Sequence, residues 1–204
     1  MLPRNYNFEI YKTLARIHQL RAHRVALQLP EGLLMYATTI ADLLTVWSRR
    51  IASALRAEET AEGTEEGAQW QGVEDVIIMG DVTYGACCID DYSCQALECA
   101  LLVHYGHSCL VPTTHTTLPV LYVFVDILID LEHFIQTVRL NFTPETRLLL
   151  ISTIQFSQAL HQSHQQLKTH FPHLTVPQAR PLSGGEILGC TSPAVASGDY
   201  DALM

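Results

Sequence analysis

The chain has 204 residues, of which 48% are hydrophobic, and it carries a formal net charge of -9. This length and composition suffice for a buried core in one large or two small domains, which excludes a disordered chain. The negative charge argues against nonspecific nucleic-acid binding. No run of about 18 apolar residues predicts a membrane span, and residues 1–7 lack the apolar core of a signal peptide. We therefore expect a cytoplasmic protein with neither a membrane nor direct nucleic acid as a partner.

Short apolar runs alternate with helical patterns along the first half of the chain. In chain order, the predicted elements are a strand at 25–29, a turn at 30–32, a helix at 33–55, a strand at 76–79, a helix near 93–100 and a strand at 101–104. Residues 57–72 separate the first helix from the second strand and are rich in Glu, Thr, Gly and Ala. We interpret this acidic segment as an exposed insertion loop.

The second half shows the same alternation. Its predicted elements are a strand at 120–125, a helix at 131–140, a strand at 148–152, a helix at 156–171, a short strand at 174–176 and the start of another strand at 201–204. Continuous apolar strands that alternate with helices indicate an α/β fold, with parallel sheet covered on both faces. We predict two related parallel-sheet α/β domains, residues 1–117 and 118–204, divided near Thr117.

Two glycine-containing turns carry cysteines. The first cysteine turn, residues 80–91, follows an apolar strand and contains the pair Cys87 and Cys88, whereas the second, residues 184–193, contains Cys190. Open α/β sheets bind ligands at the carboxyl ends of their strands, so we expect chemistry at the first turn. Six cysteines without a secretory signal favour reduced thiols, and a metal, cluster or catalytic role therefore outranks disulfides. Because the two cysteines of the pair are adjacent, we expect one to bind and the other to pack.

The remaining cysteines are predicted to pack in the core. Cys94 and Cys99 lie in or near a predicted helix, and unpaired cysteine is among the most buried residue types. Cys109 is assigned to packing for the same reason. A zinc site could be drawn from these three cysteines with His104 and His107. The spacing argues against zinc, because no Cys-x-x-Cys is present and the ligands would come from a helix, a strand and a turn.

Polar side chains also lie where predicted strands end. The candidates for holding a small polar ligand are Gln28, His104 and His107 in the first domain and Gln155 in the second. The two histidines flank Tyr105 and Gly106, where hydrogen bonds to a substrate carboxylate are chemically reasonable. A purely structural hydrogen-bonding role for both histidines remains the alternative.

Five segments carry a resemblance to a known family: residues 80–91, 104–109, 121–126, 152–156 and 185–193. They resemble the enzymes of the first step of diphthamide biosynthesis, the 2-(3-amino-3-carboxypropyl)histidine synthases, and are most similar to the subunit 1 branch. The resemblance extends over nearly the whole chain except the acidic segment. Segments of this length and specificity are not expected by chance.

The resemblance implies three related α/β domains, each giving one cysteine to a [4Fe-4S] cluster. S-adenosylmethionine, the cosubstrate, is implied to bind at the iron that lacks a protein thiolate. On this sequence the implied ligands are Cys87, directly after Gly85 and Ala86, and Cys190. No third-domain cysteine precedes the end at Met204. We therefore expect a truncated chain without the third domain, unable to hold a stable cluster by itself.

The resemblance also implies radical transfer of the 3-amino-3-carboxypropyl group to a histidine imidazole carbon of elongation factor 2. The implied partners are a paralogous subunit 2 in a heterodimer, elongation factor 2 as protein substrate and an electron-donor protein. The implied cosubstrate contacts are Gln28, His104, His107 and Gln155. Two alternatives stay open. One is a catalytically silent binding module of the same complex, and the other is an enzyme with a nucleophilic Cys87 or Cys88 activated by a nearby histidine.

Overall fold

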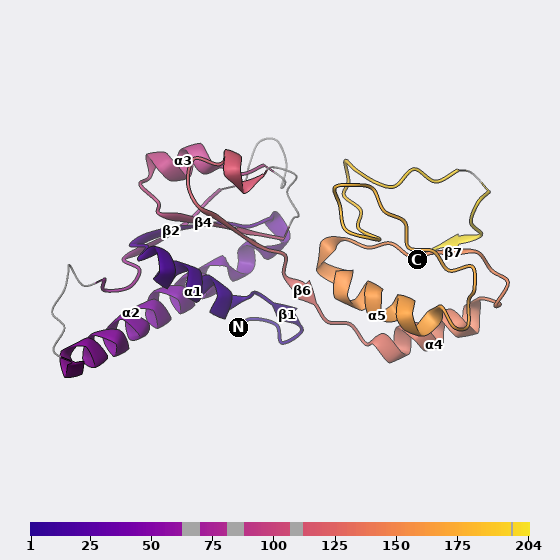
Figure 1. Cartoon of the computed structure of the whole chain (residues 1–204), viewed down its shortest axis with the longest axis horizontal. Helices are drawn as coiled ribbons and strands as arrows, with labels where there is room; N and C mark the ends of the chain where they lie inside the picture. The colour runs from indigo at the N-terminus through magenta and orange to yellow at the C-terminus, as the bar shows by residue number, and fades with distance from the viewer. Residues whose placement is uncertain (63–69, 81–87, 107–111, 197) are drawn as a thin grey trace. The chain divides into compact units, whose positions relative to one another are not determined.

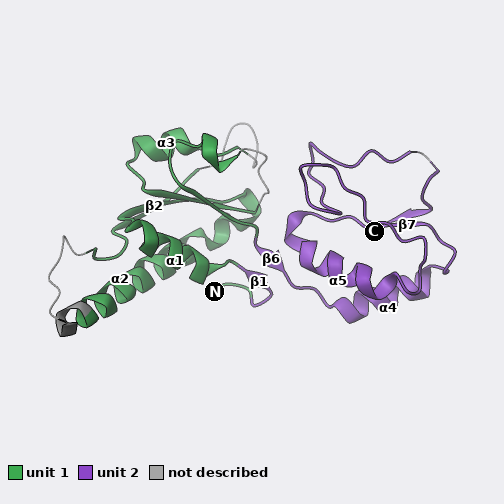
Figure 2. Cartoon of the chain, viewed as in Figure 1, with its two compact units in different colours: residues 1–3, 8–124 green, residues 4–7, 125–204 purple. Residues whose placement is uncertain are grey.

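The computed structural model describes residues 1–62, 70–80, 88–106, 112–196 and 198–204. It divides into two compact units (Figure 2). Unit 1 comprises residues 1–3 and 8–124, and unit 2 comprises residues 4–7 and 125–204. The predicted division near Thr117 falls before this boundary, inside unit 1.

Unit 1 is built on a four-stranded parallel sheet in the order β3-β2-β4-β5 (Figure 1). Its strands are β2 (Arg24–Gln28), β3 (Asp75–Ile78), β4 (Leu101–Tyr105) and β5 (Val120–Val123). β2 and β4 are the central strands, and their continuous apolar runs are buried because both faces of the sheet are covered. The predicted α/β class is confirmed. One prediction was wrong: β5, which we assigned to the second domain, pairs with β4, and this pairing places it in unit 1.

Helices cover both faces of this sheet (Figure 1). α1 (Ile10–Leu20) and α2 (Ala37–Glu62) lie on one face, and α3 (Asp91–Ala96) lies on the other. Two 3-10 segments, η1 (Glu31–Tyr36) and η2 (Thr113–His115), precede α2 and β5. We did not predict α1 from the sequence. It buries Leu14 and Ile17 but begins without a side-chain cap, so the usual start signal of a helix is absent.

The acidic segment is only partly a loop. α2 continues to Glu62, so the first residues of the segment are helical rather than irregular. Near its other end Trp70 is 5% exposed, and the indole N–H donates to the Ala22 carbonyl at 3.0 Å. Residues 63–69 lie outside the described part of the chain. The prediction of an exposed loop over 57–72 was therefore wrong at both ends. At the first end the helix continues, and at the second end composition alone does not show that Trp70 is buried and bonded to Ala22.

Unit 2 contains two small sheets. β1 (Tyr6–Asn7) pairs antiparallel with β6 (Asp126–Ile127), and β7 (Leu148–Leu149) pairs in parallel with β8 (Ala202–Leu203). Isolated parallel bridges link Leu149 to Thr175 and Ser152 to Glu186, on segments that follow β7 in the chain. The strands predicted at 148–152 and 174–176 are therefore shorter than expected. Their hydrogen bonds go to irregular segments instead of a continuous ladder.

Two helices cover one face of β7 (Figure 1). They are α4 (Leu131–Asn141) and α5 (Ser157–Leu167), the latter preceded by the 3-10 segment η3 (Ile154–Phe156). The core between helices and sheet consists of Ile135, Val138, Leu148, Leu150, Leu160, Leu167, Phe171 and Leu174. In the described part of the chain, no helix is long and apolar enough to cross a membrane.

Candidate functional site

The carboxyl edge of the unit 1 sheet carries a row of polar side chains. Gln28 at the end of β2 lies opposite His104 of β4, and His104 lies opposite Tyr122 of β5. Since alternate residues of a strand share a face, Gln28 and His104 lie on the same face as Ala26 and Leu102, which pack in the α3-side core. His104 is 1% exposed and contacts the Tyr122 ring edge-to-face at 5.6 Å. Two of the predicted ligand-binding residues are thus brought together, whereas His107 lies outside the described residues.

The first cysteine turn reaches this edge directly above Gln28. The buried Gln28 side chain donates from Nε2 to the Cys88 carbonyl at 2.6 Å, and its Oε1 accepts from the Asp90 N–H at 3.2 Å. Cys88 itself is half-buried. Cys87, the predicted ligand, lies outside the described residues. The described end of the turn is therefore tied to the end of β2 by a side chain rather than by strand pairing.

Two aspartates continue the attachment into α3. The Asp90 carboxylate caps α3 by accepting from the Ser93 N–H at 3.3 Å. Asp91 is 8% exposed, and its carboxylate accepts from the Thr117 N–H at 2.8 Å, joining the turn to the loop before β5. We did not single out either aspartate as a structural residue. The signal for Asp90 was available, because an Asp directly before a helical pattern is typical of an N-cap.

Cys94 and Cys99 lie in the core, as predicted. Cys94 is fully buried and Cys99 is 8% exposed, and both pack with Met79 and Leu118 between α3 and the sheet. Burial raises the pKa of the Cys94 thiol to about 12, and it raises the pKa of Cys99 as well. Protonated, buried thiols are poor metal ligands. Among the residues that the structure describes, no group of three or more His, Cys, Asp or Glu side chains is placed to hold a metal. Cys109, one of the residues considered above for a zinc site, lies outside the described residues.

The second cysteine turn is closed by reciprocal backbone hydrogen bonds. The Leu188 N–H donates to the Thr191 carbonyl at 2.8 Å, and the Thr191 N–H donates to the Leu188 carbonyl at 3.2 Å. Cys190 sits between them with an exposed side chain, and its Sγ accepts from the Thr191 hydroxyl at 3.7 Å. An accessible thiol in a closed turn is suited to bind a metal or cluster, in contrast to the two core cysteines.

Residues 185–187 of the second cysteine turn, which precede Cys190, run parallel to the chain at Ser152, three residues after the end of β7. The Ser152 N–H donates to the Gly185 carbonyl at 2.8 Å, and the Ile187 N–H donates to the Ser152 carbonyl at 2.9 Å. Gln155 lies just beyond Ser152 on η3 and is half-buried. Cys190 and Gln155 thus both follow the carboxyl ends of parallel segments in unit 2.

Glu186 is a buried carboxylate that we did not select from the sequence. It is 3% exposed, and its Oε2 accepts from the Ser183 N–H at 3.0 Å at the start of the second cysteine turn. The sequence did offer a signal, because Glu186 is the only charged residue within residues 184–193. A buried acid with a backbone partner stabilises the conformation of a loop, so Glu186 supports the segment that leads to Cys190.

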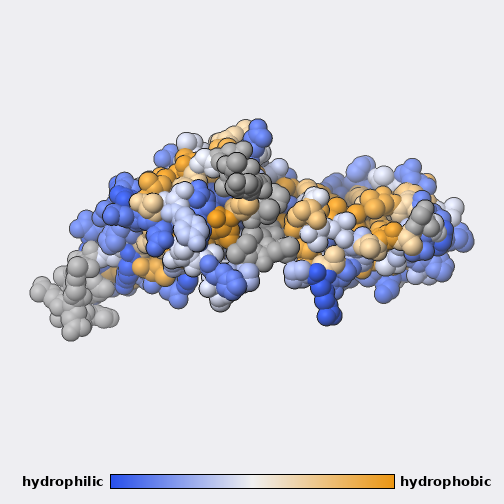
Figure 3. All heavy atoms as spheres, turned by 90° about the horizontal axis from the view of Figure 1, so that it is seen from above, coloured by the Kyte–Doolittle hydropathy of each residue, from blue (hydrophilic) through white to orange (hydrophobic). Residues whose placement is uncertain are grey.

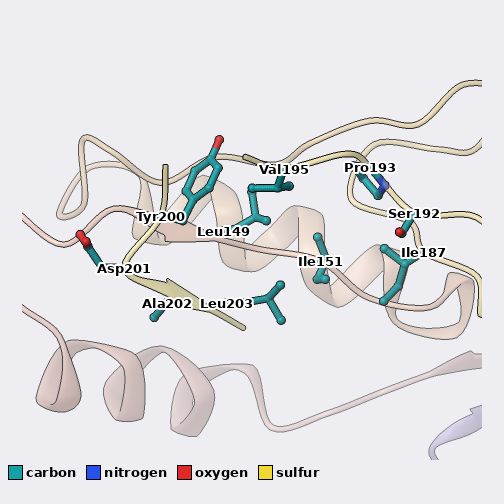
Figure 4. A pocket seen from close by; sticks show the side chains of 10 residues that line it. All are labelled: Leu149, Ile151, Ile187, Ser192, Pro193, Val195, Tyr200, Asp201, Ala202 and Leu203. Carbon is teal, nitrogen blue, oxygen red and sulfur yellow. The ribbon is translucent and has the colours of Figure 1, made fainter. Parts of the chain in front are cut away.

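A mostly apolar pocket lies on the face of β7 and β8 away from α4 and α5 (Figure 4). It has a volume of about 460 Å³ and is lined by Leu149, Ile151, Ile187, Ser192, Pro193, Val195, Tyr200, Asp201, Ala202 and Leu203. The surface view shows apolar residues gathered on this side of unit 2 (Figure 3). Its one carboxylate, Asp201, accepts from the Arg147 guanidinium at 2.7 Å, and this hydrogen bond holds the Asp201 pKa at about 2. Ser192 and Pro193 bring the second cysteine turn to the rim of the pocket.

The fold and the two turns define a class: an α/β protein in which cysteines follow the carboxyl ends of parallel segments in two successive units. The family whose sequence profile matches residues 29–204 is described as "Putative diphthamide synthesis protein", and the chain belongs to this family.

Similar proteins agree with this assignment. The chain is 50% identical over 204 residues to 2-(3-amino-3-carboxypropyl)histidine synthase subunit 1 of Gallus gallus, a match that covers 100% of this chain and 44% of that protein. It is 51% identical over 198 residues to the subunit 1 of Mus musculus, covering 96% and 40%, and 49% identical over 195 residues to that of Dictyostelium discoideum, covering 96% and 36%. The chain therefore spans less than half the length of these relatives.

Solved structures of Dph2 from Pyrococcus horikoshii share the fold. One of them, described as having a 4Fe-4S cluster, has a TM-score of 0.68 and 20% sequence identity, and the match covers 97% of this chain and 51% of that chain. The structure without that description matches with the same values. This likeness supports the parallel α/β architecture of both units.

Proposed function

We propose that this chain is part of an enzyme that transfers the 3-amino-3-carboxypropyl group from S-adenosylmethionine to a histidine imidazole carbon of elongation factor 2. The relatives that are 49–51% identical to this chain are named 2-(3-amino-3-carboxypropyl)histidine synthase subunit 1, which supports the proposal. The family match, which starts at residue 29 and runs to 204, includes both cysteine turns.

The observation that carries the proposal is the contrast between the cysteines. Cys190 is exposed in a closed turn at the carboxyl end of a parallel segment, whereas Cys94 and Cys99 are buried in the unit 1 core. We propose Cys87 and Cys190 as thiolate ligands of a [4Fe-4S] cluster, a group that a structural neighbour carries. The proposed cluster would supply the electron that breaks the bond from sulfur to the methionine γ carbon of the cosubstrate.

Polar residues at the two carboxyl edges are the proposed cosubstrate contacts. His104 and Gln155 each follow or end a parallel segment, where amide and imidazole groups can orient the amino and carboxylate groups of a ligand. His107 and Gln28 complete the predicted set. Of these four, Gln28 makes hydrogen bonds to the backbone of the first cysteine turn, and its role is argued separately below.

The proposed partners follow from the family. A subunit 1 implies an assembly with a paralogous subunit 2, and the proposed chemistry needs elongation factor 2 as substrate and a protein that donates electrons. Three thiolates would leave one iron open for the cosubstrate, and two of the three proposed thiolates are in this chain.

The test is anaerobic iron–sulfur reconstitution of this sequence extended through the third domain that the family resemblance implies, together with its paralogous subunit. Iron is then quantified, and transfer of the labelled 3-amino-3-carboxypropyl group from S-adenosylmethionine to elongation factor 2 is measured. In the extended chain, Cys190→Ala and Cys87→Ala should each abolish stable iron loading. Cys94→Ala is the matched control, because it removes a buried thiol and should leave the iron content unchanged. Unchanged iron in Cys190→Ala would overturn the ligand assignment.

The same experiment separates the alternatives. A complex that binds its partner but takes up no iron and transfers no label would indicate a catalytically silent binding module. Fast, iron-independent alkylation of Cys87 or Cys88 by iodoacetamide at neutral pH would instead indicate a nucleophilic cysteine.

A further inference from the structure

Gln28 forms a bridge whose chemistry matches a peptide group. The Cys88 carbonyl needs a donor and the Asp90 N–H needs an acceptor, and the neutral carboxamide supplies one of each, at 2.6 and 3.2 Å. These two backbone groups flank Ile89, so the side chain occupies the place that a neighbouring strand would take in a sheet. Gln28 is 3% exposed, which makes both hydrogen bonds costly to lose.

The position of Gln28 in the sheet explains why the bridge reaches the turn. Gln28 is the last residue of β2, a central strand, and lies on the face where Ala26 packs beneath α3. Residues 88–90, which lead into α3, lie within hydrogen-bond distance of Gln28 at the carboxyl edge of this face. Asp90 and Asp91 attach the following residues through α3 and Thr117, whereas the Gln28 amide bonds to the backbone of Cys88 itself.

We infer that Gln28 is a positioning residue, whose amide fixes the Cys88–Asp90 backbone, the part of the first cysteine turn that directly follows the proposed ligand Cys87 in sequence. The inference rests on the proposed function, since presenting a thiol matters only if the turn binds iron. It gives Gln28 an indirect role, through the turn, in place of direct contact with the cosubstrate.

Three variants test the inference. Gln28→Met keeps the volume of the side chain and removes both hydrogen bonds, and Gln28→Glu keeps an acceptor for Asp90 while removing the amide donor. Ser48→Ala is the matched control, because Ser48 is also fully buried in unit 1 and its hydroxyl bridges backbone groups, accepting from Val73 and donating to Thr45. Ser48 serves the segment before β3, so its loss should affect stability without affecting the cysteine turn.

The first measurement is amide hydrogen exchange in the iron-free chain. In Gln28→Met the Asp90 amide should exchange about tenfold faster, as expected for loss of one buried hydrogen bond, whereas in Ser48→Ala it should keep the rate of the unsubstituted chain. Gln28→Glu should also lose protection, because it places a carboxylate against the Cys88 carbonyl oxygen in a buried site. An unchanged Asp90 rate in Gln28→Met would overturn the inference.

The second measurement follows chelator-driven loss of the iron–thiolate absorbance after anaerobic reconstitution of the extended chain with the paralogous subunit. Gln28→Met should lose iron several times faster than the unsubstituted chain, and Ser48→Ala should not. If Asp90 exchange responds but all three variants release iron at the unsubstituted rate, positioning of a ligand is refuted. If the unsubstituted extended chain takes up no iron while Asp90 exchange responds, the proposed function fails and the bridge itself remains.

Discussion

At the scale of single residues, burial divides the cysteines into two chemical kinds. Cys94 lies wholly inside the α3-side core of unit 1, and removing its thiolate from water raises the pKa to about 12. Cys190 is exposed, and its sulfur accepts a hydrogen bond from a neighbouring hydroxyl. Because the thiolate is the form that alkylates and binds metal, Cys190 is the one of these two cysteines that is suited to either reaction.

This division predicts a labelling pattern. With iodoacetamide at pH 8, Cys190 should be modified within minutes in the native chain, whereas Cys94 should stay unmodified, since a pKa of about 12 leaves roughly one thiol in ten thousand ionised. In guanidinium chloride both should react at similar rates. Peptide mass spectrometry measures the two sites separately, and rapid native labelling of Cys94 would show that its core opens readily.

At the scale of elements, the second cysteine turn depends on a close approach of backbone to helix. Gly185 has a φ of +76°, and a Cβ at this position would lie 2.7 Å from the Leu160 Cδ1 of α5 and 3.0 Å from a Val176 methyl. Both the backbone conformation and the packing therefore require glycine. At Gly189, in the same turn, an added Cβ would meet no atom within 4 Å, so a side chain has room at this position.

We predict that Gly185→Ala destabilises unit 2 by roughly 1–3 kcal/mol through backbone strain and overpacking, while Gly189→Ala leaves stability nearly unchanged. Urea unfolding followed by far-ultraviolet circular dichroism measures the effect. Both tryptophans, Trp47 and Trp70, belong to unit 1, so tryptophan fluorescence serves as an internal control that should not shift. Equal effects of the two glycine substitutions would contradict the packing argument.

At the scale of the whole molecule, the chain contributes only part of the proposed cluster site. Cys87 and Cys190 are its two proposed ligands, and the chain spans about 36–44% of the length of the relatives described above. A four-iron cluster held by two protein thiolates has two irons without a protein ligand, and such a cluster is expected to be labile.

We therefore predict that the 204-residue chain, reconstituted alone, retains much less iron than the full-length Mus musculus relative treated identically, and transfers no label to elongation factor 2. Iron quantification after gel filtration in the absence of oxygen measures the difference. Near-stoichiometric four-iron loading and turnover by the chain alone would contradict it. Such a result would point to a further thiol of this chain, such as Cys88 or Cys109, as a ligand.

The sequence by itself determined the α/β class, the parallel strands of unit 1 and the core position of Cys94 and Cys99, because these features follow from hydrophobic periodicity and from the burial preference of cysteine. It also located Cys190 in a glycine-containing turn. Local pattern is sufficient for features of this kind, since each depends on residues close together in the chain.

Only the tertiary structure decided where β5 pairs, that Trp70 is buried and what Gln28 contacts. Each depends on a partner far away in sequence: β4 for β5, Ala22 for Trp70, and the Cys88 and Asp90 backbone for Gln28. A glutamine at the end of a strand can bind a ligand or hydrogen-bond to the backbone of a neighbouring turn, and the local sequence does not distinguish the two roles. The physical reason is that these partners come together only when distant parts of the chain pack against each other, and no local sequence pattern encodes that packing.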